Sequence, residues 1–153
     1  MRPEKIVEMQ RYGRKLDARS FAENLPDDPN VVVDMTVGNG GGLAIWCDLF
    51  PDARVIGLDI DLDGYDYLKL KNAGAFQRSN PEVYLFDKRY DNISSILDGD
   101  KIDVLIETGG KGSDRFMKHV RKFLAGDFVI FCEDWGQYDG YYVVSNCGTT
   151  VLK

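Results

Sequence analysis

The sequence has few of the residues that build disulfide frameworks and metal sites. Its 153 residues include one histidine and three cysteines, and the widely spaced Cys47, Cys132 and Cys147 form no C-x-x-C pair. This odd number and spacing argue against a disulfide framework and against a zinc knuckle. We therefore expect a reducing, cytoplasmic setting.

Long apolar runs and blocks of basic residues are also missing. No segment approaches the about 20 apolar residues of a membrane span. The N-terminal residues 1–5 lead into a charged helical pattern and not into the apolar core of a signal peptide. The formal net charge is -6, from 19 basic and 25 acidic residues. These features predict a protein with no membrane partner, and they disfavour nucleic acid as a partner.

The sequence does contain enough hydrophobic residues to form the core of one compact domain. Hydrophobic residues make up 44% of the chain and aromatic residues 12%. Residues 1–30 predict an amphipathic N-terminal helix that begins near Pro3 and ends near Leu16, followed by a turn-rich linker with Pro26 and Pro29. Residues 31–153 then form the predicted domain.

Within that domain, short β-branched and aromatic runs alternate with helical patterns. The predicted strands are 31–33, 55–59, 83–87, 103–107 and 128–132, and the predicted helices are 43–50, 65–73, 93–97 and 114–124. Such alternation predicts right-handed βαβ units and parallel strands. Runs at 141–145 and 149–152 are close enough in sequence to require an antiparallel hairpin. The predicted fold is therefore α/β, a Rossmann-like, doubly wound and mostly parallel sheet of about seven strands that ends in this hairpin.

A glycine-rich turn follows the first strand. Asp34 ends the strand in "DMTVGNGGG", and the turn contains Thr36, Gly38, Asn39 and Gly40. Glycines let a backbone approach a ligand closely, and the next helix offers unpaired N–H groups. Asp34 would repel a pyrophosphate and attract a cationic amino group, although it could instead simply cap the turn.

Acidic residues also end the following strands. Asp59 stands 25 positions after Asp34, with Ile60 beside it, where a carboxylate can accept hydrogen bonds from two ribose hydroxyls. Asp87 could accept from an adenine amino group, with Phe86 or Lys88 beside it. Glu107 ends the fourth strand and completes the row. A nucleoside that carries an amine and a sulfonium fits these acids, while each acid could also be an ordinary strand-end residue.

The run "GNGGGLAIWCDLFPDARVIGLDID" resembles the cofactor half of the class I S-adenosylmethionine-dependent methyltransferases, above all the macrocin-type O-methyltransferases. The resemblance covers Val31 to about Trp135. It implies S-adenosylmethionine as cofactor and a hydroxyl of a small molecule as methyl acceptor, and it leaves a homo-oligomer open. A small rRNA-methylase-like group shares a "D-T-GNG" turn. The acidity of the chain and the lack of an aromatic-proline base-binding motif count against that group.

The same resemblance implies a metal and a general base. In that family a fourth-strand motif and an acid pair after the fifth strand hold a divalent cation. Glu133 and Asp134 supply the pair here, as ligands for Mg²⁺, with Asp134 also catalytic. Thr108 stands at the usual ligand position and Lys111 at the usual base, although threonine is a poor ligand for a hard cation and lysine is normally protonated. Glu107 could substitute as a ligand, and Lys111 could anchor an anionic substrate.

Several aromatic and basic residues have a second interpretation. We expect His119 to lie on a solvated helix face and not in a catalytic site, and Trp46 to belong to the core. Four aromatic residues could line a substrate mouth or pack on the hairpin: Trp135, Tyr138, Tyr141 and Tyr142. Two further functions remain open: a catalytically lapsed S-adenosylmethionine-binding protein or subunit, and a nicotinamide-dependent oxidoreductase, for which a second domain is missing.

Overall fold

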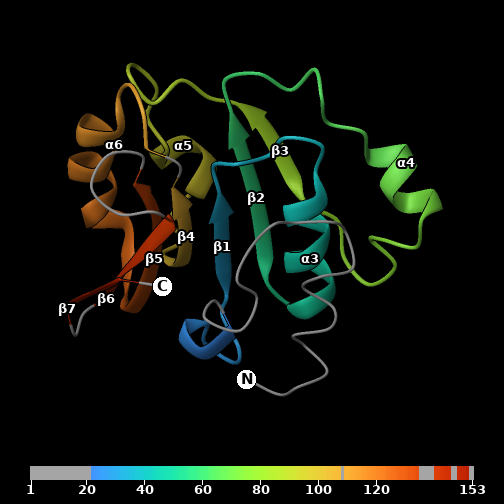
Figure 1. Cartoon of the computed structure of the whole chain (residues 1–153), viewed down its shortest axis with the longest axis horizontal. Coiled ribbons are helices and arrows are strands. Elements are labelled where there is room, and N and C mark those ends of the chain that lie inside the picture. Colours follow the sequence, from blue (N-terminus) through green and yellow to red (C-terminus); the bar gives the residue numbers. More distant parts are fainter. Residues whose placement is uncertain (1–21, 108, 135–139, 146–147, 152–153) are drawn as a thin grey trace.

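The computed structural model describes residues 22–107, 109–134, 140–145 and 148–151, and side chains only as far as Cys132 (Figure 1). The predicted N-terminal helix therefore lies outside the described residues, as do the side chains of the aromatic group that begins at Trp135. No helix in the described part of the chain is both long enough and apolar enough to cross a membrane.

The fold is built on one sheet with the strand order β3-β2-β1-β4-β5-β6-β7. Five strands run parallel: β1 (Val31–Asp34), β2 (Arg54–Asp59), β3 (Glu82–Leu85), β4 (Ile102–Glu107) and β5 (Leu124–Asp134). β6 (Gly140–Ser145) pairs antiparallel with β5, and β7 (Gly148–Val151) pairs antiparallel with β6. The predicted Rossmann-like α/β fold with a mostly parallel sheet is confirmed.

Helices cover both faces of the sheet, and each face has its own apolar core (Figure 1). α3 (Gly41–Leu49) and α4 (Tyr67–Asn72) pack on one face, where the fully buried Trp46 confirms its predicted place in the core. α5 (Ser94–Leu97) and α6 (Ser113–Val120) pack on the other, with Phe116 fully buried. The two layers follow from short parallel strands that are apolar on both sides.

The C-terminal end of α6 differs from its prediction. The helix ends at Val120, a 3₁₀ turn (η1, Arg121–Phe123) follows, and Leu124 already belongs to β5, where it is paired with Ile102. The prediction of a helix to Leu124 was wrong at this end. The apolar spacing persists because Leu124 packs on the same core from the strand, so periodicity alone could not mark where the backbone becomes extended.

The strand order determines where a ligand can bind. β1 and β4 are neighbours, but the chain leaves β1 toward α3 on one face and β4 toward α6 on the other. Loops that diverge in this way leave a crevice beyond the carboxyl ends of the strands. The turn after β1 and the ends of β2, β3 and β4 all reach this edge.

At the opposite edge, Arg54 joins three segments. Its guanidinium donates two hydrogen bonds to Glu82, from Nε to Oε2 at 2.6 Å and from Nη2 to Oε1 at 2.8 Å, and others to Asp100 and to the carbonyl of Leu97. Hydrogen bonds to charged groups stabilise by roughly 1.5–3 kcal/mol. We therefore expect Arg54→Leu to lower the free energy of unfolding by about 2 kcal/mol in urea denaturation.

Arg54→Lys is the matched control for this substitution. It keeps the charge but cannot form the two-pronged contact, so it should recover only part of the loss. A change within about 0.5 kcal/mol for Arg54→Leu would contradict a stabilising role, because that is the range of ordinary surface substitutions.

Candidate functional site

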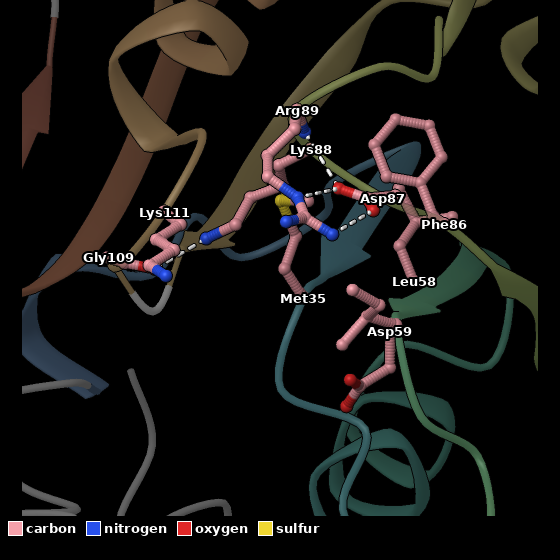
Figure 2. A pocket seen from close by; sticks show the side chains of 10 residues that line it. Met35, Leu58, Asp59, Phe86, Asp87, Lys88, Arg89, Gly109 and Lys111 are labelled. Atoms are coloured by element: carbon pink, nitrogen blue, oxygen red, sulfur yellow. Dashed lines mark hydrogen bonds and ion pairs between the residues drawn. The ribbon is translucent and has the colours of Figure 1, made fainter.

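A pocket of about 340 Å³ lies at the carboxyl ends of the parallel strands (Figure 2). Its lining comes from the segments that follow β1, β2, β3 and β4: Met35, Leu58, Asp59, Ile60, Phe86, Asp87, Lys88, Arg89, Gly109 and Lys111. The volume is within the range of small-molecule sites, roughly 300–1,000 Å³. The structure brings four of the predicted site residues together here: Asp59, Ile60, Asp87 and Lys111.

The carboxylate of Asp59 is only partly engaged in hydrogen bonds with the described residues. Its Oδ1 accepts a long hydrogen bond of 3.2 Å from the backbone N–H of Asp61, and Oδ2 accepts none from the described part of the chain. Figure 2 shows the carboxylate directed away from Lys88 and Arg89. Asp59 is therefore an acceptor available to a ligand with hydroxyl groups.

Asp87 is engaged by Arg89 on the opposite side of the pocket. Arg89 donates from Nη2 to Oδ2 at 2.7 Å, and from Nε and the backbone N–H to Oδ1 at 3.0 Å (Figure 2). These hydrogen bonds hold the pKa of Asp87 below its usual value, and the same ion pair raises the pKa of Arg89. Asp87 is thus ionised at neutral pH, and a carboxylate still has lone pairs for another donor.

Glu107, at the end of β4, is 3% exposed and paired inside the protein. Its Oε1 accepts hydrogen bonds from Lys88 Nζ at 2.6 Å and from the Ser113 hydroxyl at 2.8 Å, and its Oε2 accepts from the backbone of Gly109 at 2.8 Å. Lys88 also donates to the carbonyl of Gly109 and to Ser113. This buried pair fixes the loop after β4, and it leaves neither oxygen of Glu107 without a protein partner.

Asp34 lies beneath the glycine-rich turn and is fully buried. Its Oδ1 accepts hydrogen bonds from the backbone and the hydroxyl of Thr36, and its Oδ2 accepts from the indole Nε1 of Trp46 at 2.7 Å. The carboxylate therefore ties the turn to α3. This geometry corresponds to the alternative in which Asp34 caps the turn, and it gives Thr36 a reason to stand where glycine is common.

The other residues of the turn differ in what they offer a ligand. Gly38 has a φ of 51° and open space where a Cβ would lie, so its backbone is accessible. At Gly40 the φ is 94° and a Cβ would lie 2.6 Å from the Tyr65 ring, so the backbone conformation and the packing both favour glycine here, and its contact with a cofactor stays a prediction. The side-chain Oδ1 of Asn39 accepts a hydrogen bond of 2.9 Å from the backbone N–H of Gly41, the first residue of α3.

The predicted metal site stays a prediction. Glu133 and Asp134 end β5, but their side chains, like Thr108, lie outside the described part of the structure. Among the residues that the structure does describe, no three His, Cys, Asp or Glu side chains form a group that could hold a metal ion.

Four lining residues were missed by sequence reasoning: Met35, Leu58, Arg89 and Gly109. Each lies within two positions of an acid that was recognised at a strand end. The sequence could therefore have indicated these four residues. The carboxyl ends of parallel strands lie together, and the neighbours of a strand-end acid belong to the same loop.

His119 does not line the pocket. Its Nε2 accepts a hydrogen bond of 3.3 Å from the backbone N–H of Ile93, at the start of α5, and its ring meets Phe123 edge to face. Burial, together with the nearby charges of Lys122 and Arg115, lowers the pKa of His119 below 6.5. The histidine therefore joins α5 to α6.

This lowered pKa makes the stability of the protein depend on pH. The unfolded chain binds the proton at a higher pH than the folded chain, so stability that is present above about pH 6.5 is lost as the pH falls through the folded pKa. We expect the free energy of unfolding of the wild type to fall relative to that of His119→Gln between about pH 7 and pH 5. Parallel urea curves with no such divergence would contradict the assignment.

The comparisons with known proteins define the class of fold. No family model matches the chain. The structure is similar to MycE of the mycinamycin biosynthetic pathway, with a TM-score of 0.62 and 20% identity over 89% of this chain and 36% of that one. It is also similar to a putative caffeoyl-CoA O-methyltransferase from Staphylococcus aureus, with a TM-score of 0.58 and 10% identity over 86% of this chain and 57% of the other. The chain thus has the class I methyltransferase fold, while a special closeness to macrocin-type enzymes stays a prediction.

Two curated relatives match part of the sequence. Ribosomal RNA small subunit methyltransferase H of Frankia alni is 45% identical over 71 residues, which are 45% of this chain and 20% of that protein. The protein of the same name from Coprothermobacter proteolyticus is 38% identical over 58 residues, which are 37% and 19% of the two chains. The matched segments thus span about a fifth of the curated relatives' length.

Proposed function

We propose that this protein binds S-adenosylmethionine in the pocket and transfers its methyl group to an acceptor. The observation that carries the proposal is the available carboxylate of Asp59 at the end of β2, in a crevice at the switch point of the sheet. A carboxylate so placed can accept hydrogen bonds from both ribose hydroxyls. Solved structures of similar fold that hold S-adenosylhomocysteine, among them MycE and a plantazolicin methyltransferase, support the choice of cofactor.

The remaining lining residues suit the other parts of this cofactor. The exposed side chain of Ile60, with the small exposed parts of Met35 and Phe86, would offer an apolar surface for the adenine ring. Asp87 would accept a hydrogen bond from the adenine amino group, because a carboxylate held by Arg89 still has lone pairs for another donor. Gly38 is not one of the lining residues, but its open backbone in the turn after β1 would face the methionine portion.

In this proposal Asp34 and Glu107 have a structural role, unlike Asp59 and Asp87. Since Asp34 is buried, it supports the site by shaping the turn and not by touching the cofactor directly. Glu107 is satisfied by Lys88 and Ser113, so we do not propose it as a metal ligand. It supports the wall of the pocket by fixing the loop that carries Lys111.

For the chemical step, the bound cofactor would supply an electrophilic methyl group on a sulfonium. The protein needs only to orient the acceptor and remove its proton. For a hydroxyl of a small molecule, we propose Asp134 as the base and Lys111 as the anchor for an anionic group, with Mg²⁺ on Glu133 and Asp134.

We also infer that β6 and β7 form the C-terminal hairpin that completes a seven-stranded sheet.

A second candidate acceptor is RNA. The specific observation in its favour is the 45% identity over 71 residues with a ribosomal RNA methyltransferase. The alternative is a catalytically lapsed protein that still binds S-adenosylmethionine in this pocket but does not transfer its methyl group.

Isothermal titration with S-adenosylhomocysteine tests the binding step. We expect a saturable heat with an affinity well below about 1 mM, and stronger binding than NADH gives. Absence of heat at about 1 mM would contradict the proposal. Transfer of a labelled methyl group to RNA or to a small hydroxyl compound would then exclude the lapsed form, and loss of transfer in a chelator would support the metal.

A further inference from the structure

A stripe of positive side chains runs from the rim of the pocket along the outer side of α6 and η1. We call it the cationic stripe; its residues are Lys111, Arg115, Lys118 and Lys122, all exposed. Lys111 lines the pocket just before the helix begins, and the other three follow at spacings of three and four, which place them on one helix face. The opposite face of α6 carries the buried Phe116 and Val120.

No residue of the stripe forms an ion pair in the described part of the chain, although the charge of Arg115 lies near enough to Asp87 to help lower the pKa of that carboxylate. The ion pairs formed there use Arg54, Lys88 and Arg89 as cations, and none uses a residue of the stripe. Asp114 is the only acid between the two ends of the stripe. On a chain with a net charge of -6, this surface therefore gathers positive charge, and its three lysines form no ion pair with a described residue.

An exposed aromatic ring stands beside the stripe. Tyr90, in the loop after β3, is 72% exposed, and the Arg89 guanidinium lies 5.2 Å from the centre of its ring. Arg115 of the stripe donates hydrogen bonds to the carbonyls of Lys88, Tyr90 and Asp91 at 2.8, 3.1 and 3.0 Å. The same helix that carries the stripe thus fixes the loop that presents Tyr90.

We propose that the cationic stripe and Tyr90 form a binding surface for single-stranded RNA, which makes RNA the methyl acceptor. The phosphates lie along the stripe, a base stacks on Tyr90, and the strand leads one nucleotide to the pocket at Lys111. Lys111 precedes α6 and Lys122 lies in η1; from Arg115 to Lys122 the chain advances seven positions, about 10 Å at the helical rise. A nucleic-acid strand presents several phosphates over that length. The acceptor assignment rests on the proposed function, whereas the surface itself does not.

The combination of features favours RNA over other anionic partners. Basic grooves with exposed aromatic rings are the usual means of binding single strands, because phosphates pair with the cations and bases stack on the rings. An acidic peptide would use the charges but has no bases to stack on an exposed ring. The sequence disfavoured nucleic acid because it has no contiguous basic block. The helix nevertheless assembles the stripe from residues separated by Asp114, Phe116 and Val120.

Binding of a labelled single-stranded RNA of about a dozen nucleotides to the full chain, measured by fluorescence anisotropy over a range of salt, tests the proposal. We expect Lys118→Gln/Lys122→Gln to weaken binding about tenfold. The slope of log K against log salt should become shallower by about 1.4, because each phosphate contact contributes about 0.7 on a single strand. Tyr90→Ala should weaken binding about tenfold, and Tyr90→Phe should leave it near the wild-type value.

The matched control is Lys69→Gln/Lys71→Gln, which removes two exposed lysines from α4. We expect this control to bind RNA like the wild type, and all variants to keep the wild-type affinity for S-adenosylhomocysteine and the wild-type melting temperature. RNA binding that falls equally in the control and stripe variants would overturn the proposal. So would anisotropy that does not change with RNA, or equal binding to phosphatidylserine vesicles without any loss in Tyr90→Ala. Wild-type RNA binding without cofactor binding would overturn the proposed function alone.

Discussion

Replacing Asp59 with alanine is expected to weaken the binding of S-adenosylhomocysteine about 100-fold, with little change in the stability of the protein. The carboxylate has one weak backbone contact, the 3.2 Å hydrogen bond from Asp61, so the fold loses little without it. The cofactor would lose two charge-assisted hydrogen bonds, for which about 3 kcal/mol in total is a moderate value. That free energy corresponds to about two orders of magnitude in Kd, measured by isothermal titration.

Asp63→Asn provides the control for Asp59→Ala. Asp63 is an exposed acid of the same loop that does not line the pocket, and the substitution removes one negative charge, as Asp59→Ala does. It should leave the affinity within about twofold of the wild type, because exposed charges outside the site are screened. Equal losses in the two variants would indicate a general charge effect and would remove Asp59 from the site.

Replacing Lys88 with methionine is expected to lower the free energy of unfolding by about 3–5 kcal/mol. Lys88 and Glu107 have side chains that are only 14% and 4% exposed, and their charged atoms are 2.6 Å apart. Without Lys88, the carboxylate of Glu107 stays buried with no cation beside it, and such a charge is costly to keep. For a chain of this size the loss corresponds to a fall of roughly 10 °C in the melting temperature, which calorimetry would measure.

The double variant Lys88→Met/Glu107→Gln separates the buried charge from lost packing. The amide of glutamine can still accept from Ser113 while carrying no charge, so the double variant should recover most of the stability lost in Lys88→Met. If the double variant were as unstable as the single one, the loss would have to come from packing around the lysine stem. The same experiment with Lys111→Met should show almost no effect, since Lys111 is exposed and has no ion-pair partner in the described structure.

Local sequence patterns were sufficient to predict the parallel part of the fold. Each parallel strand was recognisable as a short β-branched or aromatic run, and the alternation with helices required parallel pairing. The ends of helices and strands were harder to predict. At Leu124, for example, an apolar residue can pack on the core from a helix or from a strand. The carboxyl ends of the strands were predictable as the ligand edge, and the predicted site residues Asp59, Ile60 and Asp87 line the pocket at that edge.

The partners of those acids were not predictable in the same way. Asp34 and Trp46 are 12 positions apart, Lys88 and Glu107 are 19 apart, and Arg115 reaches the loop after β3 across 24 to 27 positions. No local periodicity links such pairs. They form only because the sheet and its two helix layers place distant segments side by side.

The sequence by itself therefore determined the order of strands and helices and the row of acids at one edge of the sheet, because those depend on spacing along the chain. Only the tertiary structure decided which acid is available. It buries Asp34 against Trp46, neutralises Glu107 with Lys88, pairs Asp87 with Arg89 and leaves Asp59 open to the pocket. The physical reason is that burial and charge pairing depend on neighbours from other segments, which a carboxylate meets only after the chain has folded.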